Sequence, residues 1–136
     1  MELIIVTPEG QAFREQVDCV VFPGTEGEFG VLQGHERFLT PLKIGEVDIL
    51  QAGKTRRAAI SGGFADVGAD SVVAMVDTCE LDVEIDVARA EAARDRARAE
   101  LDKLSVNQAE ERSYKLQEQA LQRALVRIQA AGKAGR

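Results

Sequence analysis

The 136-residue sequence has no tryptophan, one tyrosine, one histidine and two cysteines, and it has no long apolar run. A membrane-spanning helix needs about 20 consecutive apolar residues, so the sequence predicts no such span. With His35 alone and no Cys-x-x-Cys or Cys/His cluster, a zinc site is not expected. Cys19 and Cys79 lie in strand-like runs and are expected to be buried thiols. The first residues lack a basic segment followed by a long apolar one, so we expect no signal peptide and a cytosolic or cytosol-facing location.

Charge is distributed unevenly along the sequence. Residues 1–85 contain 15 acidic and 6 basic residues, whereas residues 86–136 contain 8 acidic and 11 basic residues. The net charges of −9 and +3 account for the total of −6. This asymmetry predicts two surfaces with different partners. It does not predict nucleic-acid binding, because the basic part also carries many acids and has a single aromatic residue, Tyr114.

The most distinctive stretch runs from Phe22 to Val47 and contains five glycines and two prolines between short apolar segments. Glycine permits positive φ and proline fixes φ, so the stretch predicts tight turns between very short strands. The Gly-x-x-Gly-x-x-Gly spacing from Gly24 to Gly30 is not that of a phosphate loop, because no Lys-Ser/Thr follows it. A constrained loop with polar tips is expected to dock against a partner. Its polar residues include three acids and the only histidine, namely Glu26, Glu28, Glu36 and His35.

The rest of residues 1–85 consists of β-branched and aromatic runs separated by turn residues. The strands expected outside the glycine-rich stretch are residues 3–6, 13–22, 47–50, 55–60, 64–67, 71–76 and 78–85. Ser61-Gly62-Gly63 is expected to separate two of them. The last run alternates apolar and acidic residues from Cys79 to Ile85, which predicts a half-buried strand. Many short strands with frequent turns indicate an antiparallel β-sandwich or a flattened barrel.

The composition changes at Asp86, because glycine is absent from residues 69–131 and proline is absent after residue 41. Asp86 is expected to N-cap a helix that begins at Val87. Apolar residues then recur at spacings of three and four, which predicts helices over 87–104 and 109–130 with an interruption at 105–108. The predicted fold is therefore α+β: an N-terminal antiparallel β-sandwich, residues 1–85, followed by a C-terminal antiparallel two-helix hairpin, residues 86–136.

The apolar stripes of both predicted helices are rich in alanine. Alanine buries little apolar area, so such a hairpin is held weakly. One interpretation is a hairpin that detaches from the sandwich and binds elsewhere. The composition fits a static hairpin covering one face of the sandwich equally well.

The stretch from Phe22 to Val47 resembles the signature region of the epsilon subunit of F-type ATP synthases. The matching features are the paired glycine turns, the Gly34-His35 turn and the Thr-x-Leu-Lys-x-Gly run that begins at Thr40. Ile60–Phe64 and Ile85–Ala90 match further family motifs. The resemblance extends over essentially the whole chain and follows the family's order of β-sandwich and helical hairpin.

This resemblance implies a non-catalytic subunit of the central stalk of a rotary, proton-translocating ATP synthase. In the family, the sandwich packs on the gamma subunit and on the membrane ring of c subunits, so that ion-driven rotation reaches the catalytic head. The hairpin lies folded on the sandwich or extends along gamma toward the catalytic alpha and beta subunits, where it restrains ATP hydrolysis. The implied location is peripheral, on the cytoplasmic face of the bacterial inner membrane.

The resemblance also implies contact residues for these partners. Glu28 matches the family's acidic turn residue that meets the polar loops of the c-ring, and His35 belongs to a turn near the gamma and ring contacts. Gly30 and Glu36 are expected in the same contact region. Simpler alternatives remain, because Glu28 could be a solvated acid and His35 a hydrogen-bonded turn residue.

Several bacterial members of the family bind ATP at an Ile-Asp-x-x-Arg-Ala motif, which implies a regulatory ATP site at the start of the hairpin. The implied residues are Glu80, Ile85, Asp86, Arg89, Ala90, Arg96 and Arg123. Guanidinium groups suit triphosphate oxygens. One family arginine on the second helix is replaced by Gln119 in this sequence. Alternatively, Arg89 and Arg96 are surface residues paired with acids at helical spacing.

Three functions follow from these observations. The first is a rotor subunit that couples rotation to synthesis and regulates hydrolysis, with no required cofactor and no catalytic residue. The second is a small ATP-sensing module without a rotor role. A hydrolase fits least, because one histidine and no nucleophile–base pair offer little for the usual chemistry.

Overall fold

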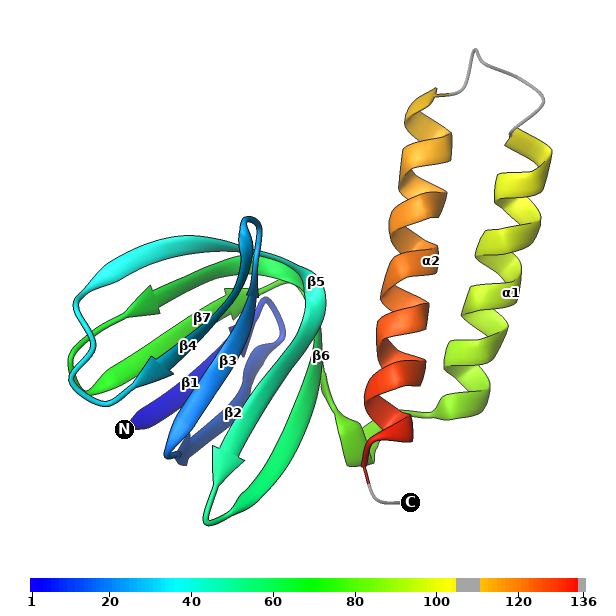
Figure 1. Cartoon of the computed structure of the whole chain (residues 1–136). Coiled ribbons are helices and arrows are strands. Elements are labelled where there is room, and N and C mark those ends of the chain that lie inside the picture. The colour runs from blue at the N-terminus through cyan, green and yellow to red at the C-terminus, as the bar shows by residue number, and fades with distance from the viewer. Residues whose placement is uncertain (105–110, 135–136) are drawn as a thin grey trace.

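The computed structural model of the chain describes residues 1–104 and 111–134. In that part of the chain, strands occupy the N-terminal two thirds and two helices follow (Figure 1). The elements are β1 (Glu2–Thr7), β2 (Gly10–Gln16), β3 (Cys19–Gly24), β4 (Gly27–Leu32), β5 (Phe38–Gln51), β6 (Lys54–Val67), β7 (Ser71–Val76), β8 (Cys79–Leu81), a 3₁₀ turn η1 (Asp82–Glu84), α1 (Val87–Leu104) and α2 (Glu111–Gly132).

The strands hydrogen-bond in the order β2-β1-β7-β6-β5-β3-β4, and β8 pairs with β6. The sheet curls over on itself into two layers because β5 and β6 are long and bent (Figure 1). The inward side chains of both layers form one core, and its largest fully buried members are Phe22, Leu3, Ile5 and Ile49. The predicted sandwich and hairpin are therefore confirmed. One pairing differs from an all-antiparallel arrangement, because β1 and β7 run parallel.

The glycine-rich region was expected to hold only very short strands, and Ser61-Gly62-Gly63 was expected to end one. Both expectations are wrong, because β5 and β6 each run for 14 residues and pair along their length. Gly62 and Gly63 have φ of +103° and +152°, so they bend β6 without ending it. A Cβ at Gly63 would overlap the carbonyl oxygen of Met75 on the neighbouring strand. Glycine here marks a bend and a close backbone approach.

Two further strands differ from their predicted bounds. The run 13–22 is divided, because the N–H of Val17 donates to the carbonyl of Met1 and the N–H of Asp18 donates to that of Leu50. The run 78–85 ends as a strand at Leu81. There the buried carboxylate of Asp82 accepts hydrogen bonds from the N–H groups of Arg57 and Val83, at 3.1 and 2.8 Å, and turns the chain into η1. Alternation of apolar and acidic residues does not reveal these side-chain bonds.

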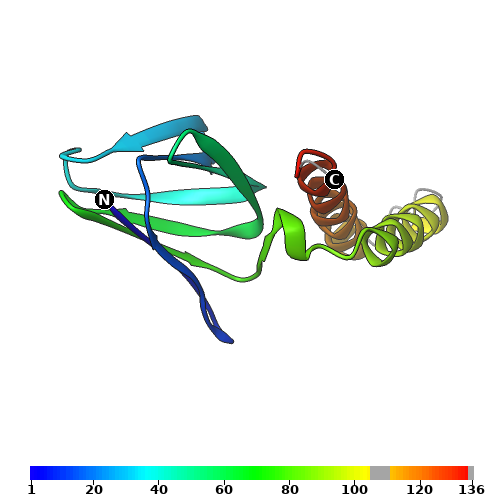
Figure 2. The same ribbon diagram turned by 90° about the horizontal axis from the view of Figure 1, so that it is seen from below.

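The helical hairpin begins where the sequence predicts. α1 starts at Val87, and Oδ1 of Asp86 accepts a hydrogen bond from the N–H of Arg89 at 3.1 Å, as an N-cap does. α2 begins at Glu111 and continues to Gly132, two residues beyond the predicted end. The predicted interruption at 105–108 and the predicted start at 109 lie outside the described residues. The helices stand beside the sandwich rather than across one of its faces, with α2 nearer the strands (Figures 1 and 2).

The two cysteines were expected to be buried, and the structure places both in half-buried positions. Desolvation of the Cys79 thiol and, to a smaller extent, the nearby carboxylates of Glu84 and Glu80 together raise its pKa to about 11. The thiol is therefore protonated and unreactive near neutral pH. Cys19 and Cys79 are both free cysteines.

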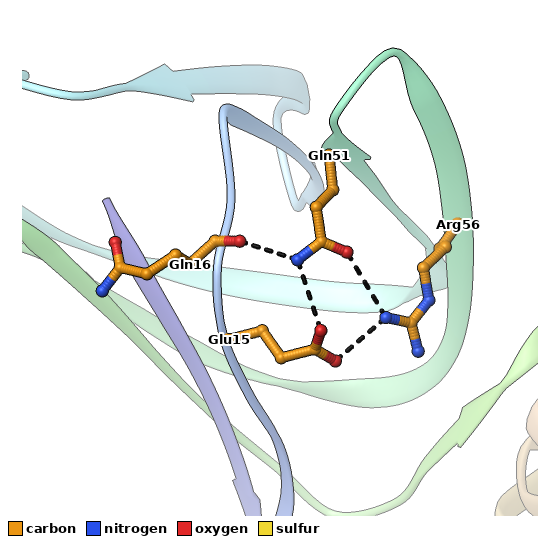
Figure 3. Close-up of polar contacts among 4 residues, drawn as sticks. All are labelled: Glu15, Gln16, Gln51 and Arg56. Atoms are coloured by element: carbon orange, nitrogen blue, oxygen red, sulfur yellow. Dashed lines mark hydrogen bonds and ion pairs between the residues drawn. The ribbon is translucent and has the colours of Figure 1, made fainter.

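A polar cluster fastens β2 to the turn between β5 and β6 (Figure 3). Nη1 of Arg56 donates to Oε2 of Glu15 at 2.9 Å, and Nε2 of Gln51 donates to Oε1 of Glu15 at 3.3 Å. The same Gln51 nitrogen donates to the carbonyl of Gln16 at 2.7 Å. The Arg56 guanidinium also lies 5.3 Å from the ring centre of Phe13. The hydrogen bonds from Arg56 and then Gln51 hold the pKa of Glu15 below its ordinary value.

We predict that Arg56→Gln raises the pKa of Glu15 toward its ordinary value, because the largest cause of the shift is removed. A carbon-detected NMR titration of the Glu15 carboxyl measures this pKa directly. Since the folded-state pKa is lowered, the contribution of Glu15 to stability is present above the unfolded pKa and is lost as pH falls through the folded-state pKa.

The control is Arg14→Gln, because Arg14 pairs with Glu2 at 3.1 Å and not with Glu15. This variant should leave the Glu15 titration unchanged. An unchanged Glu15 titration in Arg56→Gln would contradict the role given to the guanidinium.

Candidate functional site

The turn between β3 and β4 and the start of β5 surround a hollow of about 550 Å³. Three of the predicted contact residues line it, namely Glu28, Gly30 and His35. Glu28 is exposed beside the turn at Gly27, where φ is +130°. Glu36 is exposed but does not line the hollow. The structure thus brings three of the four predicted residues around one depression.

His35 is held as a turn residue within this region. Its N–H donates to the carbonyl of Leu32 at 3.2 Å, and its ring Nδ1 lies 3.0 Å from the carbonyl oxygen of Glu36. The ring also lies 5.0 Å from that of Phe38, centre to centre. Phe38, Phe29 and Phe22 continue the row at 5.7 and 5.5 Å. The turn is therefore anchored to the core by a row of tilted and edge-on aromatic rings, a support that the sequence pattern does not reveal.

A second candidate surface, absent from the sequence-based prediction, lies on the outside of β1, β7, β6 and β5. Val6 lies beside Met75, Met75 opposite Phe64, and Phe64 opposite Pro41. The next row across the same strands holds Ile4, Val73, Asp66 and Leu39. We call these eight residues the outer apolar face.

The outer apolar face is open to solvent at its largest side chains. Leu39 is 64% exposed, Phe64 51% and Met75 44%. A solvated sheet face usually carries polar residues, so a contiguous apolar one marks an interaction surface. The sequence of β7 does contain a signal for this face. Val72, Ala74 and Val76 point into the core, and Val73 and Met75, which alternate with them on the outer side, are apolar as well.

The junction between the sandwich and the hairpin holds the residues predicted to bind ATP. Nη1 of Arg127 pairs with Oε1 of Glu80 at 3.4 Å, and both side chains line a hollow of about 120 Å³ with Arg123. An adjoining hollow of about 570 Å³ is lined by Glu80, Arg89 and Arg127 among others. Three of the predicted residues, Glu80, Arg89 and Arg123, are thus gathered around Arg127.

The other predicted ATP residues have different surroundings. Ile85 and Ala90 are 3% and 1% exposed, so they serve packing. The carboxylate of Asp86 caps α1. Arg96 is exposed and lines neither junction hollow. The alternative was that Arg89 and Arg96 pair with acids at helical spacing. Within the described part of the chain neither arginine forms an ion pair; Asp95 pairs with Arg94 instead, and Glu100 pairs with Lys103.

Two further searches concern residues 1–104 and 111–134. In these ranges no group of three or more His, Cys, Asp and Glu side chains could hold a metal ion. None of the helices found there combines the length and apolar character needed to cross a bilayer.

Comparison with known proteins gives matches along nearly the whole chain. The family model for the ATP synthase delta/epsilon chain β-sandwich domain matches residues 1–82, and that for the delta/epsilon long α-helix domain matches residues 84–132. The ATP synthase epsilon chain of Geobacter metallireducens is 45% identical over 136 residues, which is 100% of this chain and 96% of the relative. That of Geobacter sulfurreducens is 44% identical over the same coverage.

Solved structures give the same result. A chain in the Euglena gracilis mitochondrial ATP synthase structure of OSCP, F1 and c-ring has a TM-score of 0.76 and 28% identity, with coverage of 95% of this chain and 79% of that chain. A chain of the Tetrahymena thermophila mitochondrial ATP synthase central stalk and c-ring has a TM-score of 0.59 and 14% identity, covers 96% of both, and supports the fold alone. The β-sandwich, the appended hairpin and the full-length matches lead to one conclusion: this chain belongs to the delta/epsilon chain family of ATP synthases.

Proposed function

We propose that this chain is a non-catalytic rotor subunit of the central stalk, which passes ion-driven rotation to the catalytic head and restrains ATP hydrolysis through its hairpin. The observation that carries this proposal is the outer apolar face on a sandwich whose own core is already complete. A core this well filled needs no further cover from within the chain, so the exposed apolar rows fit another subunit.

The gamma subunit is the proposed occupant of the outer apolar face. Its eight residues include one charged side chain, Asp66, so docking buries apolar surface without desolvating many charges. The face is built on four hydrogen-bonded strands, so it is rigid enough to transmit torque. Membership of the family, with its stalk and c-ring assemblies, supports gamma rather than a second copy of this chain.

The c-ring is the proposed partner of the hollow beside the β3–β4 turn. Glu28 and His35 present polar groups there, and the row of tilted and edge-on aromatic rings fixes the turn that carries them. The β3–β4 turn would therefore offer a polar, rigid edge to the polar loops of the c-ring. Contact with the ring and with gamma would hold the chain at the cytoplasmic face of the bacterial inner membrane as a peripheral protein.

The hairpin is the proposed regulatory part. Its charge of +3 contrasts with the −9 of residues 1–85. Extended toward the alpha and beta subunits, its basic residues would be attracted to acidic surfaces there, and salt would weaken that attraction.

We predict that Phe64→Asp weakens binding to purified gamma by about a hundredfold or more, because it places an unpaired charge at the centre of an apolar contact. Biolayer interferometry with immobilised gamma measures the change. Val83→Asp is the matched control, because Val83 is 64% exposed on η1 and lies outside both the outer apolar face and the hairpin. Equal affinities of parent and Phe64→Asp would remove this face from the gamma contact.

We also predict that removing residues 86–136 leaves assembly intact and raises ATP hydrolysis by the reconstituted complex about fivefold or more. The sandwich keeps its core in this truncation, because every residue of the main cluster lies between Leu3 and Leu81. Assembly is followed by co-purification with gamma, and hydrolysis by phosphate release. Unchanged hydrolysis in an assembled complex would refute the inhibitory role and leave the stalk role standing.

Regulation by ATP is a second proposal, favoured by the convergence of Glu80, Arg89 and Arg123 at the junction. Guanidinium groups from both helices could bind phosphate oxygens there, and binding would stabilise the folded hairpin by its higher affinity for that state. In the present arrangement Arg127 is engaged with Glu80. This proposal holds for a rotor subunit and equally for an ATP-sensing module without a rotor role.

Calorimetric titration of the whole chain with MgATP tests it. We expect Arg123→Ala to weaken binding about tenfold, because a charge-assisted contact is lost. Arg98→Ala on the exposed side of α1 serves as the control. Absence of heat in the parent chain would exclude the ATP site. Tight MgATP binding without gamma binding would favour the sensing module.

A further inference from the structure

The hairpin meets the sandwich over a small area at one end. Ala130 and Ala131 of α2 are buried against Ala59 of β6 and against Ile85, with Val87 and Val126 at the edge. This cluster is separate from the main core. Further along α2, a hollow of about 610 Å³ lies between the helix, at Gln119 and Arg123, and the bends of β5 and β6. The hairpin is therefore seated mainly by the last turns of α2 (Figure 1).

Charged residues surround this small apolar contact. Nζ of Lys133 lies 3.0 Å from Oε2 of Glu46 on β5. Nη1 of Arg57 on β6 donates to the carbonyl oxygen of Lys133 at 3.4 Å, and Nε of Arg57 lies 3.6 Å from Oδ1 of Asp48. Asp48 and Arg57 are direct partners across the β5–β6 pair. The C-terminal end of α2 thus contacts charges that the paired strands hold side by side.

Arg57 also contacts η1, the 3₁₀ turn that precedes the hairpin. Its backbone N–H donates to Oδ2 of the buried Asp82 at 3.1 Å, just before α1. The turn before α1 and the segment after α2 therefore both contact a single residue of β6. Figure 2 shows, from below, η1, the start of α1 and the C-terminal end of α2 near one another.

The charges around the contact are partly removed from water. The Glu46 side chain is 13% exposed and that of Arg57 22%. Oε1 of Glu46, Oδ1 of Asp48 and Nε of Arg57 are buried without a hydrogen bond. A partly buried charge that loses its partner costs more than an exposed one does. Apolar burial by alanine is small, so these contacts have a large influence on whether the hairpin stays seated.

We infer that Glu46, Asp48, Arg57 and Lys133 form a C-terminal latch that sets the balance between a docked and a released hairpin. Breaking the latch at Lys133 frees both helices together, because α1 and α2 pack against each other and Lys133 lies beyond the end of α2. Rising ionic strength favours release, because the attraction between these side chains is screened. The latch is a property of this chain alone, and its effect on ATP hydrolysis rests on the proposed function.

The test places two spin labels on the full-length chain, at Lys54→Cys on the β5–β6 turn and Glu118→Cys on α2, with Cys19→Ser and Cys79→Ser. Double electron–electron resonance then measures the docked and released populations. We expect Lys133→Ala to raise the released-to-docked ratio about tenfold, between the effects typical of exposed and of buried pairs. Glu46→Gln should act in the same direction. The charge swap Glu46→Lys with Lys133→Glu should restore docking.

Lys115→Ala is the matched control, because Lys115 lies on the same helix and has no ion pair among the described residues. It should leave the populations unchanged, and salt should shift the parent more than Lys133→Ala. Identical populations in the parent, Lys133→Ala and Glu46→Gln at every salt concentration would overturn the latch. This measurement contains no other subunit, so that result would leave the stalk role intact. Conversely, if Phe64→Asp did not weaken gamma binding, the stalk role would be affected and the latch would not.

Discussion

The bent pair of strands β5 and β6 is the constraint on which the rest of the structure depends. The two strands stay paired from Phe38 opposite Val67 to Gln51 opposite Lys54. Gly62 and Gly63 allow β6 to turn sharply without losing the ladder, and the backbone of Met75 fills the space that a side chain at Gly63 would need. One continuous pair can therefore belong to both layers of the sandwich, with β7 on one side of it and β3 on the other.

Each candidate surface is attached to this pair, and two of them share the beginning of β5. The outer apolar face lies where β5 and β6 run beside β7 and β1. The hollow lined by Glu28 lies at the beginning of β5. The charges that hold Lys133 lie beyond the bend, at Glu46, Asp48 and Arg57. All three surfaces are therefore carried by one hydrogen-bonded unit.

Burial is divided unequally between the two parts of the chain. The sandwich core includes large side chains such as Phe22, Ile5 and Ile49, while the contact between the hairpin and the sandwich uses Ala59, Ala130 and Ala131. At about 25 cal/mol per Å² of apolar area, alanine contacts contribute far less than the core does. The contact between the hairpin and the sandwich is consequently the more weakly held of the two clusters.

Local sequence patterns were enough to predict the class of fold, the Asp86 cap, the start of α1 and the turn-rich region around Glu28, because periodicity, capping and glycine placement act over a few residues. The sequence also carried the family resemblance that the comparisons confirmed. Tertiary structure alone decided that Gly62 and Gly63 bend a long strand, that β1 runs parallel to β7, and that Val6, Met75, Phe64 and Pro41 form one row. It likewise decided that Arg57 meets Asp82, Asp48 and Lys133, and that Arg96 lies apart from Glu80. These outcomes depend on which strands pair and in what register, and residues distant in the chain leave no local pattern from which such pairing can be read.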